Sequence, residues 1–177
     1  MEKEILDNEM LQIEPRVSVQ VIISTEKFIF LSIITFGIYP LWWIYKAWRF
    51  FKQLEKSDTI PLLRTIFSIV YLYNLFDKIQ TYADEKGIEK RYSTDFLFTS
   101  IIVVNFLGRL PFPYSLISLS SCLFFLKPMK ALNFAKENAS EITCKKEKFL
   151  NIRQILLVLA GIVLWYFIIR MEFLVEY

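Results

Sequence analysis

The sequence predicts an all-α integral membrane protein with about four transmembrane helices, a re-entrant or interfacial helix and amphipathic cytoplasmic helices. Hydrophobic residues make up 55% of the 177 residues, whereas soluble domains are about 45–50% apolar even when glycine is counted. The excess lies in large side chains, because the chain has 17 phenylalanines and only 4 glycines. The mean hydropathy is +0.40. A soluble globule of this size cannot bury so much apolar surface, and the composition also excludes disorder and a disulfide framework.

The chain lacks the residues that most catalytic and metal sites use. It contains no histidine, which excludes Ser-His-Asp and Cys-His nucleophile systems and removes the commonest zinc ligand. Cys122 lies in an apolar run and Cys144 in a lysine-rich stretch, so neither a CxxC motif nor a disulfide framework is indicated. We therefore expect no enzymatic activity, no metal site and no cofactor.

Residues 1–26 form a polar, acidic N-terminal segment, and residues 27–177 form the predicted helical membrane domain. The segment does not resemble a cleaved signal peptide, because no basic region leads directly into an apolar core. β-branched residues alternate over residues 16–24, which favours a short strand. A strand needs a pairing partner, so an interfacial segment lying against the bilayer is the alternative.

The first apolar run, 28–45, is just long enough to cross a membrane, and Gly37 and Pro40 should kink it. Aromatic rings of the kind that prefer the headgroup level gather near its end, namely Trp42, Trp43, Tyr45 and Trp48. The helix should continue to Ser57 with an apolar stripe opposed by a basic face of Lys46, Arg49, Lys52 and Lys56. This pattern predicts a helix on an anionic membrane surface; a helix packed on a neighbouring helix is the alternative.

The next uncharged run, 65–76, has 12 residues and is too short to span a membrane alone. We interpret it as a re-entrant or interfacial helix. A charged amphipathic stretch follows from Asp77 to Arg91, with a break expected near Gly87.

The remaining apolar runs are 96–108, 114–126 and 154–169. Ser93 should cap the first of them, and a proline-containing turn connects it to the second in a hairpin of short transmembrane helices. The last run should be a further transmembrane helix, with Trp165 and Tyr166 in an aromatic belt at its end.

The distribution of charge predicts the orientation. If the run 65–76 stays on one side, segments 46–95 and 127–153 share that side and hold nine and seven of the 21 basic residues. The positive-inside rule then places this side in the cytoplasm, with four crossings and both termini outside. A re-entrant first run is the alternative, and it would keep the N-terminus inside.

Few polar groups lie inside the apolar runs, and those present are Asn74, Asn105 and Arg109. Without an acidic residue at mid-membrane depth a proton relay is not expected, and the asparagines are typical of hydrogen bonds between helices. Two functions remain open. One is self-assembly in the bilayer as a homo-oligomeric pore or membrane-perturbing protein. The other is a non-conducting anchor or scaffold whose basic cytoplasmic surface recruits a protein partner or anionic lipid. No nucleic-acid partner is expected.

The stretch Thr35-Phe-Gly-Ile-Tyr39, followed by Trp43-Ile-Tyr45, resembles a T-x-G-I-Y-x-x-x-W-x-Y pattern. Small uncharacterised multi-pass bacterial membrane proteins, described only as domains of unknown function, share this pattern. The resemblance implies a location in the bacterial inner membrane and no established activity.

Overall fold

The computed structural model describes residues 19–140, 142–146 and 150–175. The helices are α2 (Thr25–Ile34), α3 (Ile38–Glu55), α4 (Pro61–Ile66), α5 (Ser68–Glu85), α6 (Thr94–Leu107), η1 (Tyr114–Phe125), α7 (Leu126–Glu137) and α8 (Ile152–Val175). Two short strands accompany them, β1 (Gln20–Ile22) and β2 (Cys144–Lys146). The described part of the chain is therefore predominantly helical, as the composition predicts.

Strand β1 lies within the segment 16–24, of which residues 16–18 are outside the described residues. It pairs in parallel with β2, so that Gln20 lies opposite Cys144 and Ile22 opposite Lys146. The partner strand comes from the polar segment that follows α7. The pairing joins the start of the described chain to its last third.

The prediction of one kinked helix over residues 28–45 is wrong, because the chain reverses between α2 and α3. Phe36 and Gly37 both have positive φ, 52° and 83°, and this left-handed backbone ends α2. The Thr35 hydroxyl strengthens the turn by donating to the Leu31 carbonyl and accepting from the Tyr39 N–H. Pro40 lies in the first turn of α3, where its missing N–H has no intrahelical acceptor to lose.

Residues 65–76 are divided between α4 and α5, which are separated only at Phe67. Helix α5 continues through the charged stretch to Glu85, and Gly87 with a φ of 85° follows its end. Nearly all the large apolar side chains of α4 and the start of α5 are exposed, namely Leu62, Leu63, Ile66, Phe67, Ile69 and Val70. A helix with this much exposed apolar surface is suited to an interface.

Helix α6 begins at the predicted Ser93 cap, whose hydroxyl accepts a hydrogen bond from the Phe96 N–H. It packs along η1 to form the predicted hairpin. The second arm does not stop at residue 126, since η1 leads directly into α7 and the two form one helical stretch from Tyr114 to Glu137. Charged residues are compatible with a helix, so the end of an apolar run does not mark the end of the helix.

Helix α8 is long, strongly apolar and largely exposed. Within its stretch Ile152–Met171, an 18-residue segment has a mean hydropathy of 2.2 and is only 11% buried. It rests on α2 at Gly161, where a Cβ would lie 2.2 Å from the Ile34 carbonyl oxygen. Nearby, the Trp165 indole N–H donates to the Ile33 carbonyl and its ring contacts Phe36 edge-on.

Two helical stretches of the described chain are long and apolar enough to cross a membrane, Tyr114–Glu137 and Ile152–Met171. The sequence predicted four. The other two correspond to α2, with 10 residues, and α6, with 14 residues, whereas about 20 residues are needed to cross the hydrocarbon core alone.

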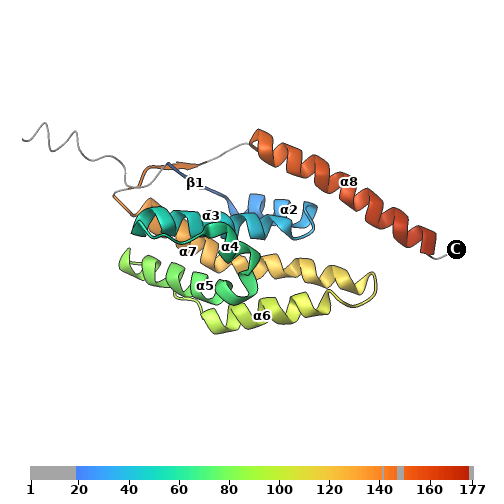
Figure 1. Ribbon diagram of the computed structural model, residues 1–177, viewed down its shortest axis with the longest axis horizontal. Helices are drawn as coiled ribbons and strands as arrows, with labels where there is room; N and C mark the ends of the chain where they lie inside the picture. Colours follow the sequence, from blue (N-terminus) through green and yellow to red (C-terminus); the bar gives the residue numbers. More distant parts are fainter. Residues whose placement is uncertain (1–18, 141, 147–149, 176–177) are drawn as a thin grey trace, which may run out of the picture.

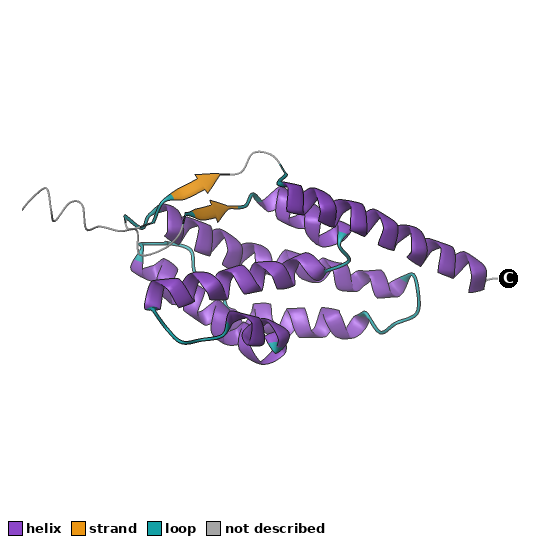
Figure 2. Ribbon diagram, turned by 45° about the horizontal axis from the view of Figure 1, so that its top comes forward, coloured by secondary structure: helices purple, strands orange, loops and turns teal. Residues whose placement is uncertain are grey.

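The elements divide the molecule into two ends (Figure 1). The C-terminal ends of α3, α5 and α7 lie together with both strands, as Figure 2 also shows, and we call this the basic end. The α2–α3 turn, the α6–η1 turn and the C-terminal end of α8 lie opposite, and we call this the apolar end (Figure 1). An aromatic core formed by Phe50, Phe51 and Tyr82 holds α3 against α5 within the basic end.

Candidate functional site

A pocket of about 260 Å³ lies at the basic end between β1, α3 and α7. Four basic side chains line it, Lys46 and Arg49 from α3, Lys136 from α7 and Arg153 from the first turn of α8. Among the described residues that line the pocket, none is acidic. Cations concentrated around a concave site attract a ligand of opposite charge, so this pocket has the chemistry of an anion site.

Helical periodicity brings these side chains together. Lys46 and Arg49 are three residues apart on α3, and Asn133 and Lys136 are three apart on α7, so each pair lies on one face of its helix. The Asn133 amide donates to the Ile23 carbonyl at 3.0 Å. This bond fixes the end of the β1 segment against α7 and so defines one wall of the pocket.

Lys136 is the buried cation of the pocket, with 6% of its surface exposed. Its ammonium group lies 4.4 Å from the centre of the Phe50 ring, an arrangement in which the ring face attracts the charge. Lys136 lies ten residues beyond the apolar run 114–126, at the basic end. The pKa of Lys136 is lowered to about 8, mainly by burial; Cys144 partly opposes this effect, and Lys46 adds to it. An anion in the pocket would favour the charged form.

Cys144 borders this region from β2, and its thiol contacts the backbone carbonyl of Lys136 at 3.3 Å. Burial raises the pKa of the Cys144 thiol, with Lys136 partly opposing this effect. The thiol is therefore protonated at neutral pH, and it packs as a neutral group. Lys146 on the same strand pairs with Glu137 at 2.8 Å, which neutralises charge outside the pocket.

The predicted basic face of α3 is divided by the structure. Lys46 and Arg49 line the pocket, whereas Lys52 and Lys56 are not among its lining residues. The apolar stripe opposite this face is buried in the protein core at Ala47, Trp48 and Phe51. The helix therefore cannot place that stripe in a bilayer, and the alternative of a helix packed on its neighbours is correct.

The predicted interfacial aromatic residues also fall into two groups. Trp43 and Trp48 are 5% and 2% exposed, so the prediction that they lie at the lipid headgroups is wrong: α3 turns these rings into the core. Trp42 and Tyr45 stack on each other at 5.5 Å near the surface. Tyr166 is exposed on α8, and Trp165 packs on α2.

The predicted intramembrane polar residues are not gathered into one polar site. Asn74 is exposed on α5, and the Asn105 amide donates to the Ile101 carbonyl of its own helix at 2.8 Å. The Arg109 guanidinium lies 5.2 Å from the Phe106 ring centre. Asn105 and Arg109 line a second, mainly apolar cavity of about 500 Å³ between the α2–α3 turn, α5, α6 and η1.

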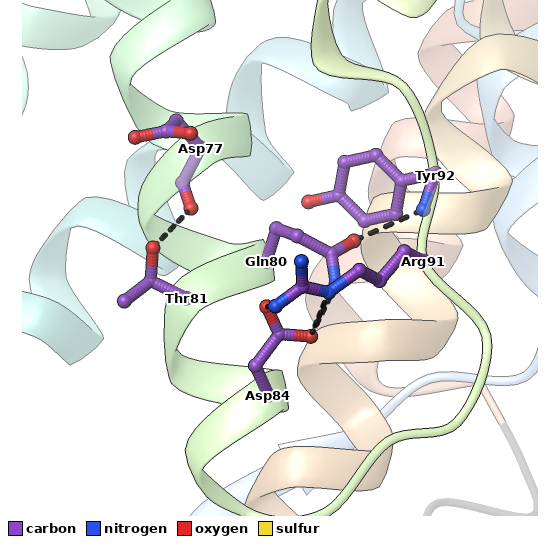
Figure 3. A network of polar contacts seen from close by, with 6 residues as sticks. All are labelled: Asp77, Gln80, Thr81, Asp84, Arg91 and Tyr92. Atoms are coloured by element: carbon purple, nitrogen blue, oxygen red, sulfur yellow. Dashed lines mark hydrogen bonds and ion pairs between the residues drawn. The ribbon is translucent and has the colours of Figure 1, made fainter.

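A polar network fastens the loop after α5 to that helix (Figure 3). Arg91 contacts both carboxylate oxygens of Asp84, at 2.7 and 3.2 Å, and Gln80 accepts from the Tyr92 N–H at 3.1 Å. The Tyr92 hydroxyl donates to the Phe76 carbonyl. Burial raises the pKa of Tyr92, with Asp77 and Asp84 adding to the effect. Every group in this network has a partner, so its role is structural.

Sequence reasoning missed Lys136, Asn133 and Arg153 as site residues. They lie in a long polar segment and at the start of an apolar run, where lysine and arginine normally face solvent. The spacing of Asn133 and Lys136 on one helix face was the available signal. Within the described part of the chain there is also no cluster of histidine, cysteine, aspartate and glutamate that could hold a metal ion.

Comparison with families of known proteins gives one match. The model of the family described as Domain of unknown function (DUF4234) matches residues 23–173, so the chain belongs to that family. This agrees with the expected resemblance to a domain of unknown function. No curated protein and no solved structure matches the chain significantly.

Proposed function

We propose that this member of a family of unknown function is a non-catalytic membrane anchor of the bacterial inner membrane, whose basic end binds anionic lipid on the cytoplasmic side. The observation that carries the proposal is the division of the molecule into an apolar end and a basic end that contains a cationic pocket. The large exposed apolar side chains of α8, α6 and α4 are what a bilayer would cover.

This proposal refines the topology. The segments 46–64, 77–95 and 127–153 would lie on the cytoplasmic side. Helices α2 and α3 would form a re-entrant hairpin, since the chain reverses at Gly37. Helix α8 would cross the bilayer, and the α6–η1 hairpin would enter it from the basic end and return. The start of α2 would then be cytoplasmic, as the re-entrant alternative for the first run requires.

Lipid selectivity tests the proposal. The protein is reconstituted into bilayers, and the immobilised fractions of spin-labelled phosphatidylglycerol and phosphatidylcholine are compared. We expect a preference for phosphatidylglycerol, since each basic residue near an anionic surface contributes about 1 kcal/mol, and the preference should weaken with added salt. Combined replacement of Lys46, Arg49 and Arg153 by glutamine should reduce it.

The matched control is replacement of Arg109 and Arg170, which lie on the predicted far side, by glutamine. That variant should keep the wild-type preference. Equal immobilisation of the two lipids by the wild-type protein would contradict the anchor proposal.

Self-assembly is the second candidate, and the exposed face of α8 favours it. Asn105 already bonds within its own helix, so Asn105→Leu should leave the oligomer size unchanged, whereas leucine-to-alanine changes at exposed Leu156 and Leu159 on α8 should reduce it. Light scattering of the purified protein in detergent measures this size. A clean wild-type monomer would contradict self-assembly and, with it, a pore.

A further inference from the structure

The geometry points to a phosphate-binding site in the pocket between β1, α3 and α7, which takes a phosphate monoester through Lys46, Arg49, Lys136 and Arg153. This site would be the place at which the proposed anchor binds its ligand. The inference rests on the proposed function only where it prefers a lipid headgroup over a soluble compound as the source of the phosphate group. No part of the family match assigns a ligand to this pocket.

The first argument is charge. Three separate elements, α3, α7 and the start of α8, each direct at least one cation to a cavity of about 260 Å³. Like charges brought together oppose one another, and burial disfavours the charged form of an amine. A dianion in the cavity reverses both effects at once. Among the described lining residues no carboxylate supplies that charge.

The second argument is burial. Lys136 is 94% covered and belongs to a helix that also carries exposed lysines such as Lys130. A lysine with only a structural role normally extends its ammonium group to water. Here the group stays beside the Phe50 ring at 4.4 Å and lines the cavity. This placement positions a donor in advance for a ligand.

The third argument is the set of donors. The guanidinium groups of Arg49 and Arg153 match phosphate oxygens through paired N–H bonds, and lysine supplies a compact charge. A phosphate monoester carries about −1.5 to −2 charge at neutral pH and has three acceptor oxygens. A single carboxylate carries less negative charge and has fewer acceptor oxygens than a phosphate monoester, so it matches four cations less well.

The position of Arg153 favours a lipid source. It lies at the start of α8, two residues before the exposed apolar residues Ile155 and Leu156. Lys46 lies 5.8 Å from the ring centre of Trp42, whose ring is also exposed. The pocket is thus next to surface that is suited to the bilayer, so a lipid headgroup is the nearer source of phosphate.

Binding to the full-length protein in neutral detergent tests the site. Isothermal titration is carried out with inorganic phosphate and, separately, with short-chain phosphatidic acid, using phosphatidylcholine of the same chain length as the comparison. We expect saturable binding of inorganic phosphate, of phosphatidic acid or of both, and none of phosphatidylcholine. Binding of phosphatidic acid alone identifies a lipid source, and binding of both identifies the phosphate group itself as the determinant.

Two variants and their controls identify the pocket. Lys136→Met should weaken binding at least tenfold, whereas Lys130→Met on the exposed side of the same helix should not change it. Arg153→Gln alters an exposed side chain that folding does not require, and should weaken binding about threefold to tenfold, with Arg170→Gln as its control. Absence of binding in the wild type, or unchanged binding in both Lys136→Met and Arg153→Gln, overturns the site. If the protein binds phosphate but shows no preference for anionic lipid in bilayers, the phosphate site stands and the proposal of a lipid-binding anchor is wrong.

Discussion

At the scale of single residues, Lys136 is the least expected feature of the molecule. Its side chain is 6% exposed and stays beside Phe50. The folded pKa of about 8 lies below the ordinary value of 10.5, so the charged amine opposes folding below pH 8. This opposition is relieved as the pH rises from about 8 towards 10.5.

Lys136→Met should therefore stabilise the unliganded protein at pH 7, by roughly 1–3 kcal/mol. The measurement is denaturant-induced unfolding in detergent at pH 7 and pH 10. The difference in the free energy of unfolding between the variant and the wild type should be smaller at pH 10, where the amine of the folded wild type is already neutral. Lys130→Met, on the exposed surface, should change little. A variant less stable than the wild type at pH 7 would show that the charge has a partner.

Phosphate affinity should depend on the same group. Between pH 7 and 9.5 affinity should fall as Lys136 loses its proton, since its pKa is about 8 without ligand. The other groups around it are Lys46 and Arg49 from α3, Arg153 from α8 and Cys144 from β2, whose thiol pKa is raised. Titrations across this range measure the dependence, and Lys136→Met should lose most of it.

The sequence could not predict this pocket, for a physical reason. Lys46, Lys136 and Arg153 are far apart along the chain, and each has an ordinary sequence environment. Only the packing of α7 against α5 and the bond from Asn133 to the β1 segment bring them to one cavity. Two of the four basic residues of the pocket, Lys46 and Arg49, were singled out from the basic face of α3.

At the scale of elements, local signals with one structural meaning were predictable. The Ser93 cap, the break at Gly87 and the proline-containing hairpin all follow from short sequence patterns. Signals with two meanings were not. Gly37 is compatible with either a kink or a reversal of the chain. Because Phe36 beside it also has a left-handed backbone, the chain reverses. The aromatic residues of α3 are compatible with either lipid or core. Trp43 is buried against Phe28 and Phe125, and Trp48 is buried beneath Arg64, so both belong to the core.

The contact between α2 and α8 depends on a glycine. A Cβ at position 161 would lie 2.2 Å from the Ile34 carbonyl oxygen, and backbone cannot move aside cheaply. Gly161→Ala should therefore displace α8 from α2 and lower stability by about 1–3 kcal/mol, even though alanine is the better helix former.

Thermal unfolding in detergent and the fluorescence of Trp165, which bonds to Ile33 across this contact, report the displacement. Ala160→Ser, at the exposed neighbouring position, is the control and should leave both unchanged. Wild-type fluorescence and stability for Gly161→Ala would show that α8 does not pack on α2 at this point.

At the scale of the whole molecule, chain reversals produce the separation of charge. The chain turns back at Gly37 and again after α6, and each time the charged continuation returns to the basic end (Figure 1). The described parts of segments 46–95 and 127–153, which carry fifteen of the 21 basic residues, are thereby brought towards one end. A bilayer that covers the apolar end leaves these residues beside the headgroups, where their charge acts on anionic lipid.

Orientation in the cell tests this account most directly. Cysteine is introduced in place of Lys86, at the basic end, or of Arg170, at the far end of α8, in a protein with Cys122→Ala and Cys144→Ser. Intact cells are treated with a membrane-impermeant maleimide. We expect labelling of Arg170→Cys in intact cells and of Lys86→Cys only after permeabilisation. Labelling of Lys86→Cys from outside, or of both positions from the same side, would contradict the account.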